Sequence, residues 1–498
     1  MREKLLKYIE PTMPLEEMAI MDTQTPDNKM NAEDLAIKQS EHVGRIYPFL
    51  KVDSYVFNFH DILSMELDMN DKLPKYTFTI VDGSGVFAGS HMPKSDIIAS
   101  LYIKSSNDKV YNPIRNDIYI TSIIPTGKTS TKGDVSEGRG NIYMVKGILF
   151  VPQLNNLAMK NALKGTSLEV LKKIAKTLKL GFVTNESSTN DSMNWLMTNS
   201  TFKDINEIVK HAYKDDNSFY TWFIDQYYCL NFINVADMLN DEEEQFDNII
   251  PKFIGYVNDH KNPNDKTSED NKDESNTVVV PLLLSNHSEM IGMDTFISDF
   301  KLRANQGSIL NKFSYKHVLS YYDPYLDRSN LDNNFVEYGM YSYDMYKLKN
   351  EDILTTTRYS YGGVDYKNTH TNYIDANIRN AKNLLELEQI NLLAQTNEMN
   401  FHIIRGMTVP VIIMKQGLET KNEDTQEVRE NVKGEDFSST EDKLQVNINN
   451  MLTGPYVVNG IKYIYKLGTD NRFFYNTYLT LCKNVWDEKY KNVVTEDV

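Results

Sequence analysis

The chain has 498 residues, enough for about three or four domains of ordinary size. Hydrophobic residues make up 41% and charged residues 24% of it, which is usual for a folded protein. The formal net charge of −16 argues against a general nucleic-acid binder, which needs basic surfaces. The 31 Tyr and 21 Phe residues favour strands and flat contact surfaces.

Cys229 and Cys482 lie far apart and among apolar residues, so we expect buried thiols rather than a disulfide framework or a metal site. The N-terminus has no uninterrupted apolar segment, and no window approaches the length of a membrane span. We therefore predict no signal peptide, no spanning helix, and synthesis and assembly in the cytosol.

The N-terminal part, residues 1–49, is polar and Met-rich and is predicted to be an arm. From there to residue 157 the chain alternates in short strands, such as "KYTFTIVDGSG" and "NIYMVKGILF", separated by turn residues. This pattern is typical of an antiparallel barrel or sandwich. We predict a first β-barrel over residues 50–157.

The next segment, 158–257, is predicted to be an α/β insert. Apolar residues at helical spacing in 165–182 indicate a helix, with a capping box formed by Thr166 and Glu169 and with Gly181 at its C′ position. A second helix, "TFKDINEIVKHAY", is expected to bury one stripe of side chains: Phe202, Ile205, Ile208, Val209 and Ala212.

Four further segments complete the chain. We predict a charged loop over 258–276, a Tyr-rich β region over 277–373, a connecting helix over 374–397 and a second β-barrel over 398–498. The second barrel is interrupted by a charged loop at 418–445. The predicted fold class is α+β and β-dominated, with two small antiparallel barrels that flank the insert and the Tyr-rich region.

The stretch "HAYKDDNSFYTWFIDQYYCLNF" (211–232) gathers residue types that occur in active sites. His211 falls in the last turn of the second helix, where a partial positive charge complements the helix dipole. "KDDNS" is an exit turn, and "FYTWFID" and "YYCLNFINV" form two strands, with Cys229 on the second. Nothing forces Cys229 against His211, and Asp215 and Asp216 are expected to be exposed turn carboxylates.

Other motifs also favour structure over chemistry. "SIIPTGKTSTKGD" (122–134) has Ser122 where a phosphate loop needs glycine, and Gly83, Gly85 and Gly89 have the wrong spacing for a dinucleotide fingerprint. No two histidines of the chain lie at a spacing typical of metal ligands. The nine histidines are His42, His60, His91, His211, His260, His287, His317, His370 and His402. We therefore predict no catalytic residue, no cofactor and no metal site.

Three stretches, in this order, resemble the tail or baseplate hub proteins of bacteriophages, of the late control D family, which is related to the hub part of type VI secretion spike proteins. Residues 165–235 resemble the hub's insertion domain. "MNFHIIRGMTVPVIIMK", with Arg405 and Gly406 at its turn, resembles the opening of the second barrel. "YVVNGIKYIYK" and "FYNTYLTLCKN" resemble that barrel's closing hairpin.

The resemblance implies a structural virion protein and no enzyme: a late protein that forms a homotrimer. Its two tail-tube-like barrels would give six barrels in three copies, which join a sixfold tail tube to a threefold central spike. The implied partners are the tail tube protein, the spike, other baseplate proteins and DNA, which passes through the channel without specific binding. The implied location is the virion tail, assembled in the host cytoplasm.

Two alternatives remain open from the sequence. Abundant acidic pairs allow a tail-associated wall hydrolase, and tyrosine-rich stretches such as "VEYGMYSYDMY" allow a β-rich receptor-binding protein. The negative net charge also suggests an acidic channel wall that repels phosphate.

Overall fold

The computed structural model describes eighteen segments of the chain, and the structural statements below concern these residues. They are 46–52, 55–87, 97–105, 114–128, 141–155, 162–197, 199–239, 283–291, 295–304, 316–322, 335–342, 355–360, 369–388, 390–401, 403–415, 448–449, 451–468 and 473–483.

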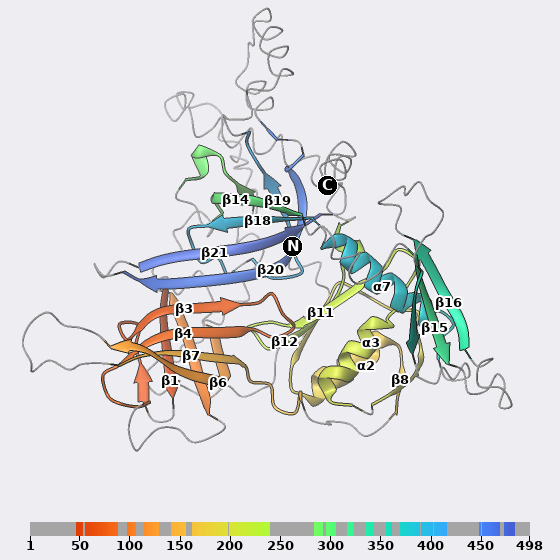
Figure 1. Cartoon of the computed structure of the whole chain (residues 1–498), viewed down its shortest axis with the longest axis horizontal. Helices are drawn as coiled ribbons and strands as arrows, with labels where there is room; N and C mark the ends of the chain where they lie inside the picture. Colours follow the sequence, from red (N-terminus) through yellow and green to blue (C-terminus); the bar gives the residue numbers. More distant parts are fainter. Residues whose placement is uncertain are drawn as a thin grey trace, which may run out of the picture.

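A large, mainly antiparallel sheet of 13 strands dominates the molecule (Figure 1). Its strands are β1 (Ile46–Val52), β2 (Tyr55–Phe57), β3 (Ile62–Asp68), β4 (Lys75–Asp82), β5 (Ile98–Ser105), β6 (Ile114–Lys128), β7 (Asn141–Leu149), β13 (Leu284–Ser285), β14 (Ile297–Ala304), β18 (Ile390–Thr396), β19 (Thr408–Ile412), β20 (Gly454–Leu467) and β21 (Phe473–Cys482).

Two runs of strands within this sheet have the same order. The first run, which we call the first β unit, is β3-β4-β7-β6-β5-β1. The second β unit is β14-β18-β21-β20-β19-β13. Numbered by their place in the chain, both units read second, third, sixth, fifth, fourth, first. One difference is that β1 pairs antiparallel with β5, whereas β13 pairs parallel with β19.

The two units are joined by direct pairing of β3 with β20. The pairs run from Asp68 opposite Lys462 to Ser64 opposite Lys466. Side chains on one side of this ladder are fully buried: Met65, Leu67, Tyr463 and Tyr465. Residues of both units and of the insert belong to one contiguous hydrophobic core, so the ladder lies over shared apolar packing.

The β-dominated α+β class predicted from the sequence is confirmed, but the described strands form no closed barrel. In the second unit the ends of the strand series approach each other, because Ser285 of β13 bridges to Phe296, the residue before β14. The described part of the chain also contains no helix that is long and apolar enough to cross a membrane.

The insert contains two helices and two small sheets beside the large sheet. Helices α2 (Ser167–Thr177) and α3 (Thr201–Lys210) accompany the sheet β11-β12-β9, formed by Tyr220–Ile224, Cys229–Asn234 and Gly181–Thr184. The other sheet pairs β8 (Ala162–Gly165) with β10 (Met193–Leu196). The apolar stripe predicted for α3 is largely buried, with Phe202 partly exposed.

The region after the insert differs in part from the sequence prediction. Helix α7 spans Tyr373–Leu387, and residues 390–396, predicted to continue it, form β18 instead. Pairing with β14 on one side and β21 on the other favours the strand over local helix propensity. Strands β15 (Lys316–Tyr322), β16 (Phe335–Ser342) and β17 (Thr355–Ser360) form a separate sheet.

At the N-terminus, β1 begins at Ile46, within the segment predicted to be an arm. Residues 1–45 and the loops predicted at 258–276 and 418–445 lie outside the described residues. The predicted domain limits therefore stay a prediction.

The ends of α2 show one confirmed and one wrong prediction. Thr166 and Glu169 form the predicted capping box. The left-handed C′ residue, however, is Lys179 (φ 57°), not Gly181, which starts β9. The N–H of Leu180 donates to Ala175 O and that of Lys179 to Lys176 O, the two bonds of a Schellman motif.

We predict that Lys179→Gly raises the free energy of unfolding by about 0.5–1 kcal/mol, because glycine adopts positive φ without a Cβ clash. Chemical denaturation of the purified variant would measure this. Lys176→Gly, in the last helical turn, is the matched control and should lower stability by about 1 kcal/mol. Equal effects of the two changes would contradict the assigned cap.

Candidate functional site: the junction of the insert with the two β units

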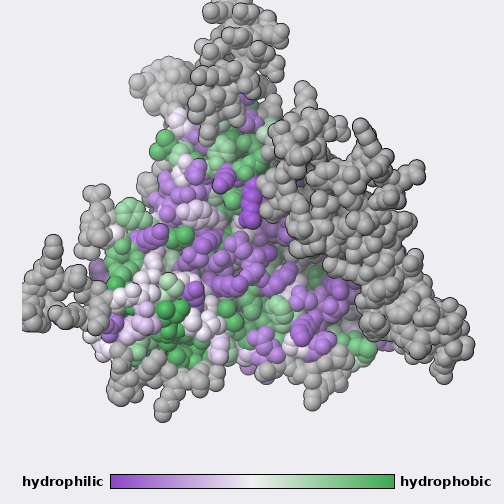
Figure 2. Space-filling model, viewed as in Figure 1, coloured by the Kyte–Doolittle hydropathy of each residue, from purple (hydrophilic) through white to green (hydrophobic). Residues whose placement is uncertain are grey.

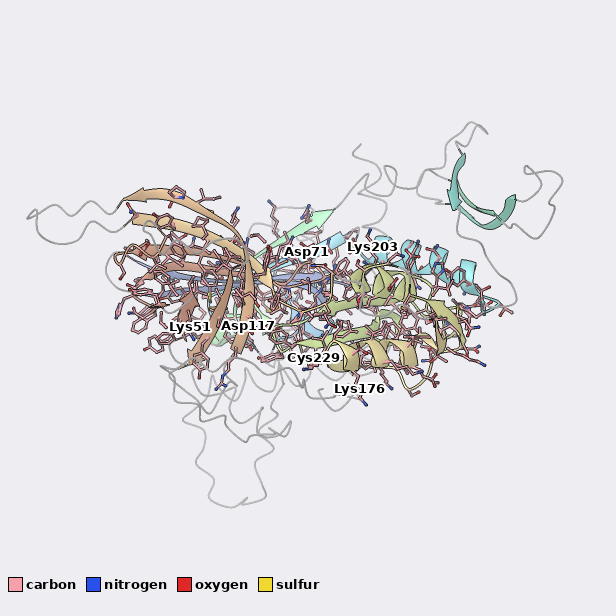
Figure 3. The ribbon with its side chains drawn as sticks, turned by 90° about the horizontal axis from the view of Figure 1, so that it is seen from below. Lys51, Asp71, Asp117, Lys176, Lys203 and Cys229 are labelled. Carbon is pink, nitrogen blue, oxygen red and sulfur yellow. The ribbon has the colours of Figure 1, made fainter. Side chains whose placement is uncertain are left out.

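The insert is held where the two β units meet (Figure 3). Its hairpin β11–β12 meets the β3–β4 turn of the first unit and the loop before β19 of the second. The backbone N–H of Ile224 donates a hydrogen bond of 2.9 Å to the carbonyl oxygen of Lys72. Each of the three parts thus contributes backbone to one place, which we call the junction.

Arg405 and Gly406 bring the second unit into the junction. The Arg405 guanidinium donates to the carbonyl oxygens of Met69 and Asp71 and lies 4.9 Å from the ring centroid of Phe223. Gly406 has φ of 82°, and a Cβ at this position would lie 3.2 Å from the Phe223 ring. The predicted turn at these two residues is therefore present, and it needs glycine both for its backbone angle and for space.

A second set of contacts ties the insert to the first unit. Asn116 donates through Nδ2 to the carbonyl oxygen of Gln226 (2.7 Å) and accepts from the Tyr76 hydroxyl (2.9 Å). The Tyr228 hydroxyl accepts from the backbone N–H of Asp117 (2.7 Å). Burial raises the pKa of both tyrosines, so they remain protonated hydrogen-bond donors at all ordinary pH values.

Cationic groups lie at the junction despite the cost of burying charge. Burial, together with the nearby charge of Arg405, lowers the pKa of Lys72 to about 8, although Glu388 and Asp71 oppose the shift. The ammonium of Lys72 lies 5.5 Å from the Trp222 ring centroid. Burial likewise lowers the pKa of Arg405, to about 10. The junction thus carries an unfavourable charge at neutral pH.

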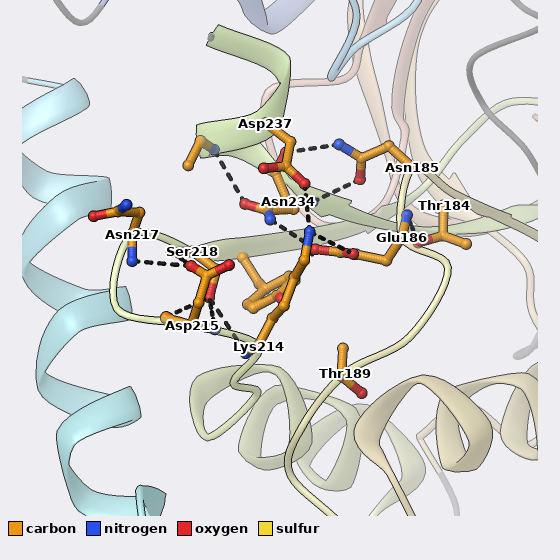
Figure 4. A network of polar contacts seen from close by, with 12 residues as sticks. Thr184, Asn185, Glu186, Thr189, Lys214, Asp215, Asn217, Ser218, Asn234 and Asp237 are labelled. Carbon is orange, nitrogen blue, oxygen red and sulfur yellow. Dashed lines mark hydrogen bonds and ion pairs between the residues drawn. The ribbon is translucent and has the colours of Figure 1, made fainter. Parts of the chain in front are cut away.

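The insert also has its own polar network, around Glu186 (Figure 4). This carboxylate is 1% exposed and accepts hydrogen bonds from Asn234 Nδ2 (2.7 Å) and the Tyr220 hydroxyl (3.2 Å). Lys214 Nζ lies 3.2 Å from Glu186 and 3.0 Å from Asp237. The buried charge of Glu186 is therefore both hydrogen-bonded and paired with a cation, which is typical of a structural network.

Helix α7 closes the C-terminal end of α3. The Asn380 amide donates to the carbonyl oxygens of Val209, Lys210 and Ala212, at 3.1–3.2 Å, and its oxygen accepts from the N–H of Tyr220. These carbonyls would otherwise lack partners at a helix end. A side chain about 170 residues away in sequence therefore caps α3.

His211 serves the same contact between α3 and α7. Its ring stacks on Tyr373 at a centroid distance of 3.6 Å, and Nδ1 lies 2.7 Å from the Tyr373 carbonyl oxygen. Burial lowers the pKa of His211, although Glu207 and this carbonyl oppose the shift. Burial thus acts against the positive charge expected at this helix end, and that charge stays a prediction.

The other residues considered as chemical candidates occupy structural positions. Cys229 and Cys482 are buried free thiols, as predicted. Asp215 accepts from two backbone N–H groups of its turn, and exposed Asp216 pairs with Arg379. The described residues hold no group of three or more His, Cys, Asp or Glu that could bind a metal.

The two glycine-containing motifs are strand and turn elements. Residues 122–128 form the last part of β6, and residues 129–134 lie outside the described residues. Gly85 (φ 72°) lies in a turn in which Asp82 accepts hydrogen bonds from the N–H groups of Val86 and Phe87. The end of β4 and the residues after it therefore form a tight turn.

No protein-family model matches this chain, and no curated protein matches it by sequence. Among solved structures, it is similar to a tail protein from Neisseria meningitidis MC58, with 11% identity, a TM-score of 0.46, and coverage of 89% of this chain and 98% of that one. The 43 kDa tail protein of prophage MuSo2 from Shewanella oneidensis gives 6% identity, a TM-score of 0.46, and coverage of 88% and 98%.

A third similar structure is a chain of the half-lidded PdpA–VgrG complex of Francisella, with 10% identity and a TM-score of 0.36. The match covers 92% of this chain and 62% of that one.

We predict that Asn380→Ala lowers the free energy of unfolding by about 2–4 kcal/mol, because it leaves several buried backbone groups without partners. The midpoint of urea denaturation would report the loss. Its neighbour Arg379, whose ion pair with Asp216 is exposed, provides the control: Arg379→Ala should cost at most about 1 kcal/mol. Similar losses for both would contradict the capping role.

We further predict that stability rises with pH above about 8 through Lys72. Its folded pKa of about 8 lies below the unfolded value of 10.5, so between these values the unfolded chain binds the extra proton and a rise in pH favours folding. Lys72→Met should remove this rise and add about 1 kcal/mol at pH 7.

Thermal midpoints at pH 7 and pH 9.5 would test this. Lys75, which pairs with Asp71 at the surface, is the matched control, and Lys75→Met should retain the rise. An unchanged pH response in Lys72→Met would show that another group causes it.

Proposed function

We propose that this chain is a non-enzymatic structural protein of a phage tail: a hub that, as a homotrimer, joins a sixfold tail tube to a threefold central spike. The observation that carries the proposal is the repeated strand order of the two β units within one sheet. A chain with two similar units presents six of them when three copies assemble. Such an assembly matches sixfold symmetry on one face and threefold symmetry on the other.

In this proposal each β unit is a small tube-like barrel. The bridge between Ser285 and Phe296 supports it, because it brings the first strand of the second unit beside the second strand. The first unit would span about 50–157. The second would combine β13, β14 and β18 with the strands of 398–498, which extends the limits expected from the sequence.

The insert is proposed to be a rigid arm at the side of each pair of barrels. Its hydrogen bonds to Lys72, Asn116 and Asp117, and the contacts of the partly buried Arg405 with Met69, Asp71 and Phe223, support a fixed attachment. Fixed geometry is what a hub needs when partners on opposite faces must be held in register.

The proposed partners are the tail tube protein on one face and the central spike on the other, with further baseplate proteins around the rim. DNA would pass through the central channel during genome ejection without specific binding. The protein would then be part of the virion tail after assembly in the host cytoplasm.

Light scattering on the purified protein tests the assembly. We expect a mass of about 172 kDa, three times the 57.5 kDa of one chain, and negative-stain class averages with six similar densities in a ring. A compact monomer that clears bacterial wall suspensions would instead support a wall hydrolase, and a monomer that binds glycans would support a receptor-binding protein.

A further inference from the structure

The repeat between the two β units extends to individual residues of β3 and β14. Each strand has a bulge at its second residue, between Ile62 and Ser64 in β3 and between Ile297 and Asp299 in β14. When the bulges are aligned, the core-facing Met65 and Leu67 match Phe300 and Leu302, which also pack against the core. The outward residues Ser64, Glu66 and Asp68 match the exposed residues Asp299, Lys301 and Arg303.

Strands β6 and β20 are equivalent in the same way. The first part of each pairs with the preceding strand of its unit, β5 or β19. The later part of each pairs with the last strand, β7 or β21. The edge of β20 that pairs with β19 also pairs, further along the strand at residues 462–466, with β3.

The corresponding part of β6 differs in one respect. None of the described strands pairs with the β5 side of β6 beyond Tyr119, and none pairs with the outer edge of β14. Residues 124–127 of β6 are exposed, including Ile124 at 43%. One chain therefore presents a β3-like edge on β14 and a β20-like edge on β6.

We propose that β14 of one copy pairs antiparallel with residues 122–128 of β6 in a second copy, and so repeats between chains the β3–β20 ladder that joins the units within a chain. The inference rests on the homotrimer of the proposed function and names the strands that form its contacts. The contact is heterologous, so each copy uses both edges and a ring closes when the rotation permits.

The internal ladder also gives the expected register. The last pair of each hairpin is Leu467 with Phe473 and Lys128 with Asn141. If these ends are aligned pair by pair, with the bulge of β6 between Pro125 and Gly127 taken into account, the residues of β6 that correspond to Ile464 and Lys462 are Ile124 and Ser122. Lys301 of one copy then lies opposite Ile124 of the next, as Glu66 lies opposite Ile464.

The charged residues on β14 do not prevent this pairing. Charges on an edge strand commonly block association of sheets. In β3, however, Glu66 and Asp68 occupy the equivalent outward positions, and that strand is paired with β20. The long unpaired edge of β14 would otherwise expose a row of backbone donors and acceptors.

Disulfide trapping tests the proposal on the full chain. Lys301→Cys is combined in turn with Ile123→Cys, Ile124→Cys and Pro125→Cys, which covers one residue of register on either side. Native Cys229 and Cys482 are buried, and burial raises the pKa of Cys482 to about 12, so neither competes in mild oxidation. Lys301→Cys with Leu196→Cys, a 70% exposed position on β10, is the matched control.

At least one of the three pairs should give covalent trimers on denaturing gels, at a yield at least tenfold above the control. A mixture of the two single-cysteine proteins should stop at covalent dimers, which shows that the bond joins different chains. A trimer by light scattering without cross-linking in any pair would overturn this strand pairing and leave the proposed hub intact. A monomer without cross-linking would overturn both.

Discussion

The pairing of β3 with β20 is the interaction on which the rest of the structure depends. It joins segments near opposite ends of the chain; the Tyr465 hydroxyl beside it bonds to the carbonyl oxygen of Phe59, 406 residues away. The ladder covers fully buried side chains from both units, including Met65, Leu67 and Tyr463. Separation of these strands would expose an edge and apolar core together, so hydrogen bonding and burial favour the same closed state.

The ladder also forms the place where the insert attaches. Because β3 lies beside β20, the turn that follows β3 comes next to the loop that precedes β19, and Arg405 can reach the carbonyl oxygens of Met69 and Asp71. The hairpin β11–β12 then closes over both through Ile224 and Phe223. The position of the insert is therefore a consequence of the sheet. Partial burial of the cations Lys72 and Arg405 costs free energy, and this cost accompanies the meeting of the three segments.

Features determined by neighbouring residues could be predicted from the sequence. Alternating strands, the capping box of Thr166 and Glu169, the β11–β12 hairpin and the turn at Gly406 all depend on local pattern or backbone conformation. The strand β18 could not, because "INLLAQT" continues an apolar helical pattern and becomes a strand only through its two neighbours in the sheet.

The contacts of the junction were also absent from the sequence prediction, for a related reason. Asn380 is one asparagine among many in the chain, and its role depends on the end of α3 lying beside α7. The residue-by-residue equivalence of the two β units was equally hidden. Its equivalent positions share burial and bulges rather than residue types, as Glu66 and Lys301 show.

The distribution of charge changes the interpretation of the acidic composition. In the view of Figure 2, hydrophilic residues gather across the middle of the molecule, over β20 and β3. By register, one face of the sheet there carries Lys75, Lys146, Lys462 and Lys466 together with Glu66 and Asp68. The net charge of −16 therefore does not arise from this face.

On this face Lys462 and Lys75 each lie beside or opposite a carboxylate. Lys462 lies 2.6 Å from Glu66 and pairs across the ladder with Asp68, which in turn is opposite Lys75. A lysine already paired with a carboxylate offers less attraction to a phosphate than a free one, since binding must first break or share that pair. If this face lines the proposed channel, pairing of Lys462 with Glu66 would weaken its attraction for DNA without requiring an acidic wall.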